Sequence, residues 1–257
     1  CERLLQRFPL EAAVPPRFAI LDDDHRAELL RTATDLVLMQ AVQNSGSELG
    51  RAHAVAVRYA AEDRFDEMLR AALSRRKVLL DADRDFDRFT SVLRRHCGVA
   101  PDAEIGALED ALANVLNNAT LGLARAALAA GSTNDQKCAA VLGRALGATS
   151  TEARIEALVD FFLTDKGQPR KSLVTKKTAA DNGWLEPALT AAQAEFHSLH
   201  VAHRSLVVVT ATLALVQLAA AVLQRYTQLK HARAALDFDD LIELSASLLK
   251  QPGHADW

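Results

Sequence analysis

The feature that most constrains the fold is the stretch from Pro187 to Lys250, which contains no further proline and no glycine. Apolar residues recur along it, and just before it, at spacings of three, four and seven, which is the period of one helical face. They are Leu185, Leu189, Ala192, Phe196, Leu199, Leu206 and Leu213. A helix from Pro187 to about His231 would be roughly 65–70 Å long, from its rise per residue. A domain of this size needs such a rod only if other helices pack along it.

The same stretch contains twenty consecutive residues without a charge, from Ser205 to Gln224. A helix that is apolar on all sides lies either in the core of a large protein or in a membrane, and this length suits both. Thr210, Thr212 and Gln217, together with the lack of a Trp and Tyr belt on both flanks, favour a buried central helix. A membrane-associated helical protein is the alternative.

The composition predicts an all-α protein. Apolar residues make up 49% of the 257 residues and aromatic residues only 5%, and the abundant alanine and leucine are strong helix formers. The one strand candidate, Leu206-Val-Val-Val209, lies inside the long helical pattern. We therefore expect residues 1–257 to form one irregular multi-helix bundle around the long helix near the C-terminus. A division into two lobes about residues 97–101 is the alternative.

The cysteines indicate the cellular compartment of the chain, and its first residues indicate whether it is part of a longer protein. Cys1, Cys97 and Cys138 are odd in number and far apart, which is typical of free thiols in a reducing compartment such as the cytoplasm. No basic start followed by an apolar run marks a signal peptide. Because the chain opens on Cys1 in the middle of an apparent helix, we expect it to be part of a longer protein. The net charge of −3 by itself neither favours nor excludes nucleic acid.

Proline, glycine and capping residues predict the helix boundaries. Pro9 should end a helix over Glu2–Phe8, and Asp22 to Asp24 should begin one that runs to about Val42. Two or three helices are expected between Glu48 and His96. Further on, the expected elements are helices at 102–118 and 119–130, and capping boxes of Thr133 with Gln136 and of Thr149 with Glu152.

No motif for nucleotide chemistry occurs in the sequence. There is no Gly-x-x-x-x-Gly-Lys-Ser/Thr phosphate loop, no Gly-x-Gly-x-x-Gly and no Gly-x-Ser-x-Gly. Asp237-Phe-Asp-Asp240 resembles the magnesium-binding acid pair of an ATPase, but the preceding Ala232–Leu236 does not have the pattern of a strand. We interpret Asp237 as a helix N-cap and Asp240 as a first-turn carboxylate. We expect no catalytic residue and no cofactor site in these 257 residues.

Two groups of polar residues match metal-ligand spacing only in part. Four aspartates alternate like the start of a calcium loop: Asp81, Asp83, Asp85 and Asp87. Phe86 and Val92 stand where that loop needs glycine and glutamate. Three histidines recur at every third residue: His197, His200 and His203. They could share a zinc ion with Glu195, but no cysteine lies at ligand spacing. We interpret the aspartates as a solvated helix start and the histidines as a polar stripe.

The best functional candidate is a basic segment, Asp165–Lys177, the longest polar stretch without a helical period. Its single acid is Asp165, and Gly167 and Pro169 predict a loop. The basic residues are Lys166, Arg170, Lys171, Lys176 and Lys177. Such side chains could neutralise nucleic-acid phosphates without reading bases. An ordinary solvated loop is the alternative.

Three segments resemble a known family. Cys1–Asp22 is similar to the segment just after the Thr-x-His-x-Phe-Cys motif of UvrD/Rep-like superfamily 1 DNA helicases. Leu236–Ile242 is similar to the segment that these helicases carry shortly before their magnesium-binding strand. Phe162–Lys171 resembles the AddA branch, the helicase-nuclease subunit of double-strand-break repair. The order and the separation of the three segments match the family.

The resemblance implies that the chain is the helical insertion called domain 1B, within the first RecA-like core of such a helicase. ATP and magnesium would then bind elsewhere in the parent protein, with the phosphate loop before Cys1 and the acid pair after Trp257. In these helicases the motor steps along single-stranded DNA, and the insertion helps guide the duplex or the separated strand. The implied partners are DNA and a second helicase-nuclease subunit.

The insertion hypothesis makes a structural prediction. Residues 1–8 and 237–250 would both return to the same core, so they should lie close together. The competing hypothesis is a helical scaffold that docks a partner subunit without contacting DNA. An exposed apolar patch of several hundred Å² would favour the scaffold.

Overall fold

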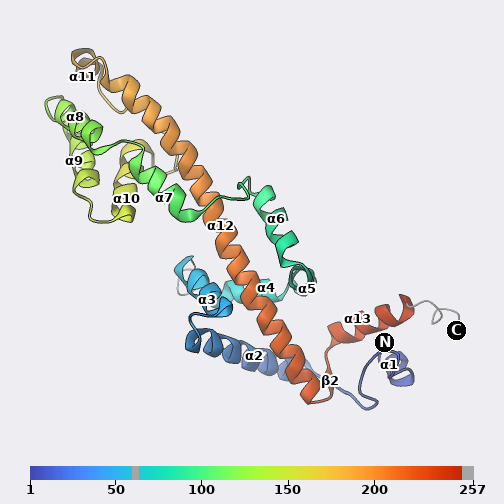
Figure 1. The fold of residues 1–257 in the computed structure, drawn as a ribbon. Coiled ribbons are helices and arrows are strands. Elements are labelled where there is room, and N and C mark those ends of the chain that lie inside the picture. The colour runs from blue at the N-terminus through green and yellow to red at the C-terminus, as the bar shows by residue number, and fades with distance from the viewer. Residues whose placement is uncertain (60–63, 251–257) are drawn as a thin grey trace. The chain divides into compact units, whose positions relative to one another are not determined.

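A computed structural model describes residues 1–59 and 64–250 of the chain (Figure 1). These residues form thirteen helices and only two strands of two residues each. The expected long helix is α12, Leu185–Ala232, with 48 residues and a length of about 72 Å from its rise per residue. The prediction of an all-α protein around one long helix near the C-terminus is confirmed.

The chain divides into two compact units. The first consists of Cys1–Phe89 together with the chain from Ala211 onward, and the second is Thr90–Thr210. Helix α12 contributes residues to both units, and so does α6, Phe86–His96. Each unit has its own hydrophobic core.

Apart from α6 and α12, the first unit contains six helices and the two strands among its described residues. Their bounds are α1 Glu2–Arg7, β1 Ala19–Ile20, α2 Asp23–Gln43, α3 Glu48–Tyr59, α4 Phe65–Leu73, α5 Arg76–Arg84, β2 Ala235–Leu236 and α13 Phe238–Lys250. As predicted, α1 ends before Pro9. Asp22 caps α2 by accepting the backbone N–H of His25 at 2.8 Å.

The described residues between Glu48 and His96 form four helices, α3 to α6, so the expectation of two or three was too low. The breaks beside α5 contain no glycine or proline, which is why no sequence signal marked them. Arg75 leaves the helical conformation with ψ 42°, and Asp85 does so with ψ 78°. The Asp85 carboxylate then accepts the N–H of Arg88 at 2.9 Å and so begins α6.

The main core of the first unit packs α2 to α5 around the second half of α12. Leu29 of α2, Leu69 of α4 and Leu79 of α5 are at most 2% exposed. They belong to one cluster with Leu218 and Val222 of α12. Burying a leucine or valine side chain contributes about 1.5–3 kcal/mol, so these contacts hold the short helices to the long one.

Segments near the two ends of the described chain lie side by side in this unit (Figure 1). β1 pairs with β2 in parallel, with Ala19 opposite Ala235. Leu5 of α1 packs in one apolar cluster with Leu241 of α13. The prediction that the two segments lie close together is therefore confirmed.

The second unit contains five further helices and the first half of α12. Their bounds are α7 Ile105–Asn114, α8 Asn118–Ala129, α9 Thr133–Gly147, α10 Thr151–Phe162 and α11 Lys176–Asp181. Phe162 and Phe196 are completely buried, with ring centroids 5.2 Å apart. They join α10 to α12 in the core of this unit.

The helix caps of α9 and α10 differ by one residue from the prediction. Ser132, not Thr133, caps α9, and it forms a reciprocal capping box with Asp135. Likewise Ser150, not Thr149, caps α10. Adjacent hydroxyl residues give the sequence more than one candidate at each site. In α9 the tertiary contacts of Asp135 fix the choice.

Helix α12 is long and apolar enough to cross a membrane by length and composition. In the structure, 44% of its most apolar 18-residue window is buried. Leu206, Val209 and Leu218, from the uncharged stretch, are at most 1% exposed. Core helices of soluble proteins can have the same composition, so length and composition alone do not assign this helix to a membrane.

Candidate nucleic-acid interface

The first half of the basic segment is an ordered hairpin in the second unit. Leu163 and Pro169 form an antiparallel bridge, and the N–H of Thr164 donates to the carbonyl of Gln168 at 2.8 Å. Gly167 closes the turn with a φ of +73°, a conformation that glycine adopts without steric cost. This is the geometry of a three-residue hairpin loop whose last residue is left-handed.

Two of the predicted phosphate-binding residues lie on this hairpin. Lys166 is exposed at its tip. Arg170 ends its second arm, where its N–H donates to the carbonyl of Phe162 at 2.9 Å and its Nε to that of Asp160 at 3.2 Å. Gln193 of α12 donates to the carbonyls of both Phe162 and Arg170. The hairpin is thus tied to α10 and α12, while the Arg170 side chain stays largely exposed.

The other three residues are also exposed, but the prediction of a single loop was wrong. Lys171 follows the hairpin, whereas Lys176 and Lys177 lie in the first turn of α11. Leu173 and Val174 are buried between the two groups. Their burial converts one polar segment into two separate basic groups, one on the hairpin and one on α11.

A buried carboxylate, Asp135, fixes α11 against the start of α9. It is 1% exposed. Its Oδ1 accepts the N–H of Thr175 at 2.9 Å, and its Oδ2 accepts the hydroxyls of Thr175 at 2.6 Å and of Thr178 at 2.9 Å. The Ser132 hydroxyl donates to the same oxygen at 2.8 Å. Burial alone would raise the pKa of Asp135, but the hydrogen bonds from Thr175, Ser132 and Thr178 outweigh it and hold the pKa well below its usual range.

The structure adds one basic residue that sequence reasoning missed. Arg204 of α12 is exposed, and its Nη1 lies 3.6 Å from the position that a Cβ on Gly167 would occupy. Arg204 therefore lies against the hairpin tip, next to Gly167. No local pattern could have indicated this neighbour, because the packing of the hairpin on α12 brings the two segments together.

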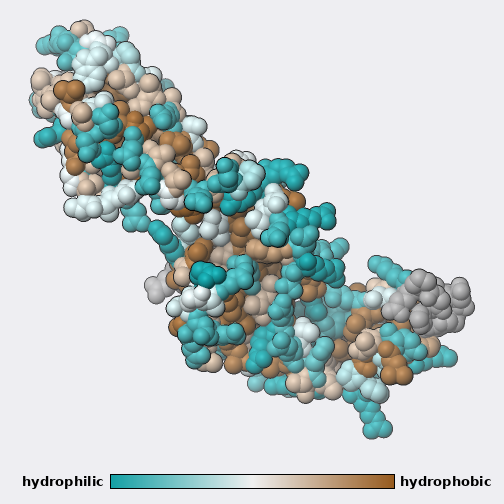
Figure 2. All heavy atoms as spheres, viewed as in Figure 1, coloured by the Kyte–Doolittle hydropathy of each residue, from teal (hydrophilic) through white to brown (hydrophobic). Residues whose placement is uncertain are grey.

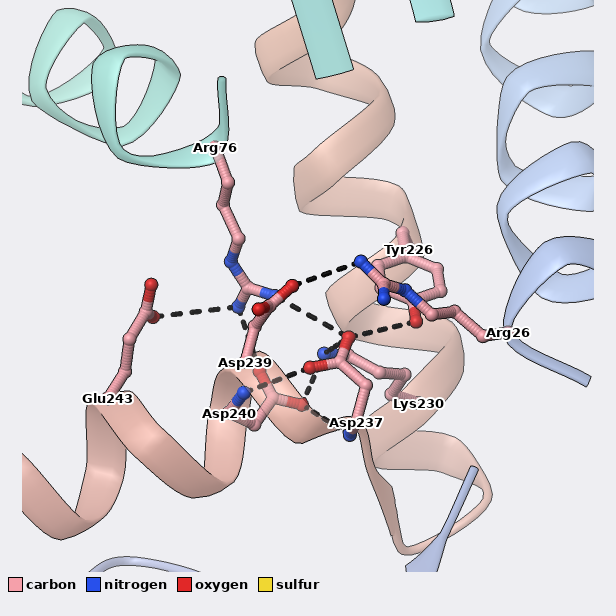
Figure 3. Close-up of polar contacts among 8 residues, drawn as sticks. All are labelled: Arg26, Arg76, Tyr226, Lys230, Asp237, Asp239, Asp240 and Glu243. Atoms are coloured by element: carbon pink, nitrogen blue, oxygen red, sulfur yellow. Dashed lines mark hydrogen bonds and ion pairs between the residues drawn. The ribbon is translucent and has the colours of Figure 1, made fainter. Parts of the chain in front are cut away.

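The first unit contains a second polar cluster, around the start of α13 (Figure 3). The Asp237 cluster, as we call it, consists of Arg26, Arg76, Tyr226, Lys230, Asp237, Asp239, Asp240 and Glu243. The buried Lys230 ammonium contacts the carboxylates of Asp237, at 2.9 Å, and of Asp240. Arg76 of α5 contacts the other oxygen of Asp240 at 2.8 Å.

Asp237 is the N-cap that the sequence predicted. Its Oδ1 accepts the N–H of Asp240 at 2.9 Å, and Oδ2 of Asp240 accepts the N–H of Asp237 at 3.0 Å. Burial would raise the pKa of Asp237, but the hydrogen bonds from Lys230, from the Asp240 backbone and from Tyr226 lower it to about 2. The satisfied donors and acceptors make this cluster a structural junction of four segments.

The aspartates and histidines that partly match metal-ligand spacing do not form a metal-binding group in the part of the chain that the structure describes. Within residues 1–59 and 64–250, no group of three or more His, Cys, Asp or Glu is placed to hold a metal ion. His203 instead faces Glu109 of α7, with 3.4 Å between Nε2 and Oε1. His200 stacks on Phe196 with ring centroids 6.0 Å apart.

No protein-family model, no curated protein and no solved structure matches the chain. Its function therefore has to be argued from its own residues, and the exposed basic groups on the hairpin and α11 are the surface with the clearest chemistry.

Proposed function

We propose that this chain is the helical accessory domain of an ATP-dependent DNA helicase-nuclease of the AddA type, acting in double-strand-break repair. The domain carries no catalytic residue. It guides DNA beside the motor core of the parent protein, which binds ATP and magnesium and works with a second subunit in the cytoplasm.

The observation that carries this proposal is the contact between the two ends of the first unit. An inserted domain must leave and re-enter its host at neighbouring points. Leu5 packs with Leu241, and β1 pairs with β2, in and directly beside the segments that resemble helicase sequences. A parallel pair of two-residue strands is far too short to form a sheet by itself. In the proposal, the β1–β2 pair is part of the larger β-sheet of the motor core.

The DNA-guiding role is supported by the exposed basic residues of the second unit. Phosphate neutralisation by lysine and arginine supplies most sequence-independent affinity for DNA. The hairpin and α11 hold their basic residues on anchored backbone, so only the side chains and not the backbone have to be ordered on binding. A guiding surface of this kind would track the backbone of DNA and would not read its bases.

The test measures binding to a duplex that carries a single-stranded tail, with fluorescence anisotropy at low salt as the readout. Replacing Lys166 and Lys171 by glutamate should weaken binding at least tenfold, because two attractive charges become repulsive. The matched control replaces Lys77 and Arg88 of the first unit by glutamate. Both residues are also exposed, and this variant should change the affinity for DNA less than twofold. Equal losses in both variants, or no DNA binding by the wild type, would contradict the proposal.

One observation favours a second function, the docking of a partner subunit without DNA contact. Phe238, Ile242 and Leu249 lie on one face of α13 and are 56%, 61% and 53% exposed. Hydrophobic residues also reach the surface where α1 and α13 lie (Figure 2). In the helicase proposal the motor core covers this face. If the chain binds no DNA, while the double variant F238D/I242D loses association with a partner subunit, the scaffold function replaces the helicase one.

A further inference from the structure

An exposed tryptophan closely follows α11 in the second unit. Trp184 is one of only two tryptophans in the chain, and it is 43% exposed. It lies in a tight turn in which the N–H of Leu185 donates to the carbonyl of Asn182 at 2.9 Å. Leu185, the next residue, is completely buried. The indole is thus partly buried and partly exposed, and its exposed part is available for contact with a ligand.

The turn that carries Trp184 is joined to the lysines of α11. The backbone N–H and the side-chain Nδ2 of Asn182 both donate to the carbonyl of Thr178 at 3.1 Å. Thr178 in turn donates to Asp135 and directly follows Lys177. The rise per residue of α11 and the Cα–Cα spacing of the residues after it together place the Cα atoms of Lys177 and Trp184 within about 17 Å of each other.

A cleft of about 300 Å³ opens next to the same turn. Lys177 and Asn182 border it on the α11 side, and Ala127 and Gly131 border it on the α8 side. Its volume is at the lower end of the range of small-molecule sites, which suits a single nucleotide. The cleft carries the Lys177 cation and the Asp181 carboxylate, and Asn182 at its border lies two residues before Trp184. A cation for phosphate and an exposed aromatic side chain thus lie on neighbouring segments.

We infer that Trp184 stacks on an unpaired base, so that this surface prefers single-stranded to double-stranded DNA. The inference rests on the proposed function, since it assumes that the surface binds DNA. Lysine can contact phosphate in single-stranded and in double-stranded DNA. Stacking on an aromatic side chain requires a base that is not already stacked within a duplex. Trp184 therefore supplies the discrimination between single-stranded and double-stranded DNA.

The test compares a mixed-sequence single strand with a blunt duplex of the same length, using the full chain. Trp184→Ala should weaken binding to the single strand roughly 5- to 150-fold, the range for loss of one stacked base. Binding to the duplex should change less than twofold. The salt slope should stay the same, because no phosphate contact is removed. Trp184→Phe should retain most of the single-strand affinity.

Two controls separate stacking from misfolding. Leu123 of α8 is also a large apolar residue of this unit and is 63% exposed, so Leu123→Ala should leave both affinities unchanged. In a Trp257→Phe background, Trp184 is the only tryptophan, and its fluorescence should be quenched by the single strand but not by the duplex.

The outcomes distinguish this inference from the proposed function. If the wild type binds DNA and Trp184→Ala leaves the single-strand affinity unchanged, or weakens both forms equally, the stacking role is wrong and the DNA-guiding role stands. If the wild type binds neither form, both are wrong.

Discussion

The ammonium of Lys230 lies 2.9 Å from Oδ2 of Asp237, and both side chains are 1% exposed. The pair spans the turn between α12 and α13, and the Tyr226 hydroxyl donates to the same oxygen at 2.9 Å. This turn leads directly into β2 and α13, the segments that pack against β1 and α1. The buried ion pair therefore determines how β2 and α13 are attached to α12.

Removing one partner of this buried pair should strongly destabilise the first unit. In Lys230→Met, the carboxylates of Asp237 and Asp240 lose their buried cation, and we expect a cost of about 3–5 kcal/mol in the free energy of unfolding. Urea unfolding followed by circular dichroism measures it. The control is Arg26→Ala, because the Arg26–Asp239 pair is more than 40% exposed on both sides and should contribute at most about 1 kcal/mol. Similar losses in the two variants would show that burial of the pair has no special effect.

The low pKa of Asp237 predicts a loss of stability in acid. The folded pKa of Asp237 lies below the unfolded value of about 3.9, so the stabilisation is fully present above about pH 5 and is lost progressively as the pH falls through the folded pKa. Asp237→Asn should be less stable than the wild type at pH 7, and the difference should shrink steadily as the pH falls from about 5 to about 1. A constant difference over this range would contradict the prediction.

Asp135 should affect DNA binding through the position of α11. Asp135→Ala leaves the N–H of Thr175 and the hydroxyl of Thr178 without their acceptor, which costs about 1–3 kcal/mol for each buried group left unsatisfied. Electrostatics alone would make this variant bind DNA more tightly, since it removes a negative charge. We expect weaker binding, because Lys176 and Lys177 lose their fixed placement. Measuring stability and affinity on the same variant tests this, and tighter binding would refute the positional role.

Gly131 should be sensitive to substitution because of the same network. A Cβ at this position would lie 2.5 Å from Oγ1 of Thr178 and 2.7 Å from Oδ2 of Asp135. Gly131→Ala should therefore destabilise the second unit by about 1–3 kcal/mol through overpacking. Gly122, inside α8, has no other atom within 4 Å of such a Cβ. Gly122→Ala should stabilise the protein by about 0.5–1 kcal/mol, and thermal unfolding of both variants provides the comparison.

The salt dependence of DNA binding should report the phosphate contacts of α11. If Lys177 contacts one phosphate, Lys177→Ala should reduce the slope of log K against log salt by about 0.7–0.9. Lys77→Ala, at an exposed lysine of α5, should leave the slope unchanged. An unchanged slope for Lys177→Ala would remove this lysine from the interface.

Much of the fold could be predicted from the sequence because the relevant signals are local. The period of apolar residues predicted α12, and the carboxylates of Asp22 and Asp237 predicted the starts of α2 and α13. Helical period and capping depend on residues within about one turn of each other. The closeness of α1 and α13 came instead from the family resemblance, since no local pattern relates the two segments.

What only the tertiary structure decided depends on contacts between distant segments. The five predicted basic residues are all exposed, but their division between a hairpin and α11 follows from the burial of Leu173 and Val174. Arg204 reaches Gly167 because the hairpin packs on α12, and Lys230 is buried because Asp237 and Asp240 meet it there. A sequence specifies which side chains can carry charge or cap a helix. Which of them meet is set by the packing of the whole chain, because the free energy of burying a charge depends on partners that local sequence does not identify.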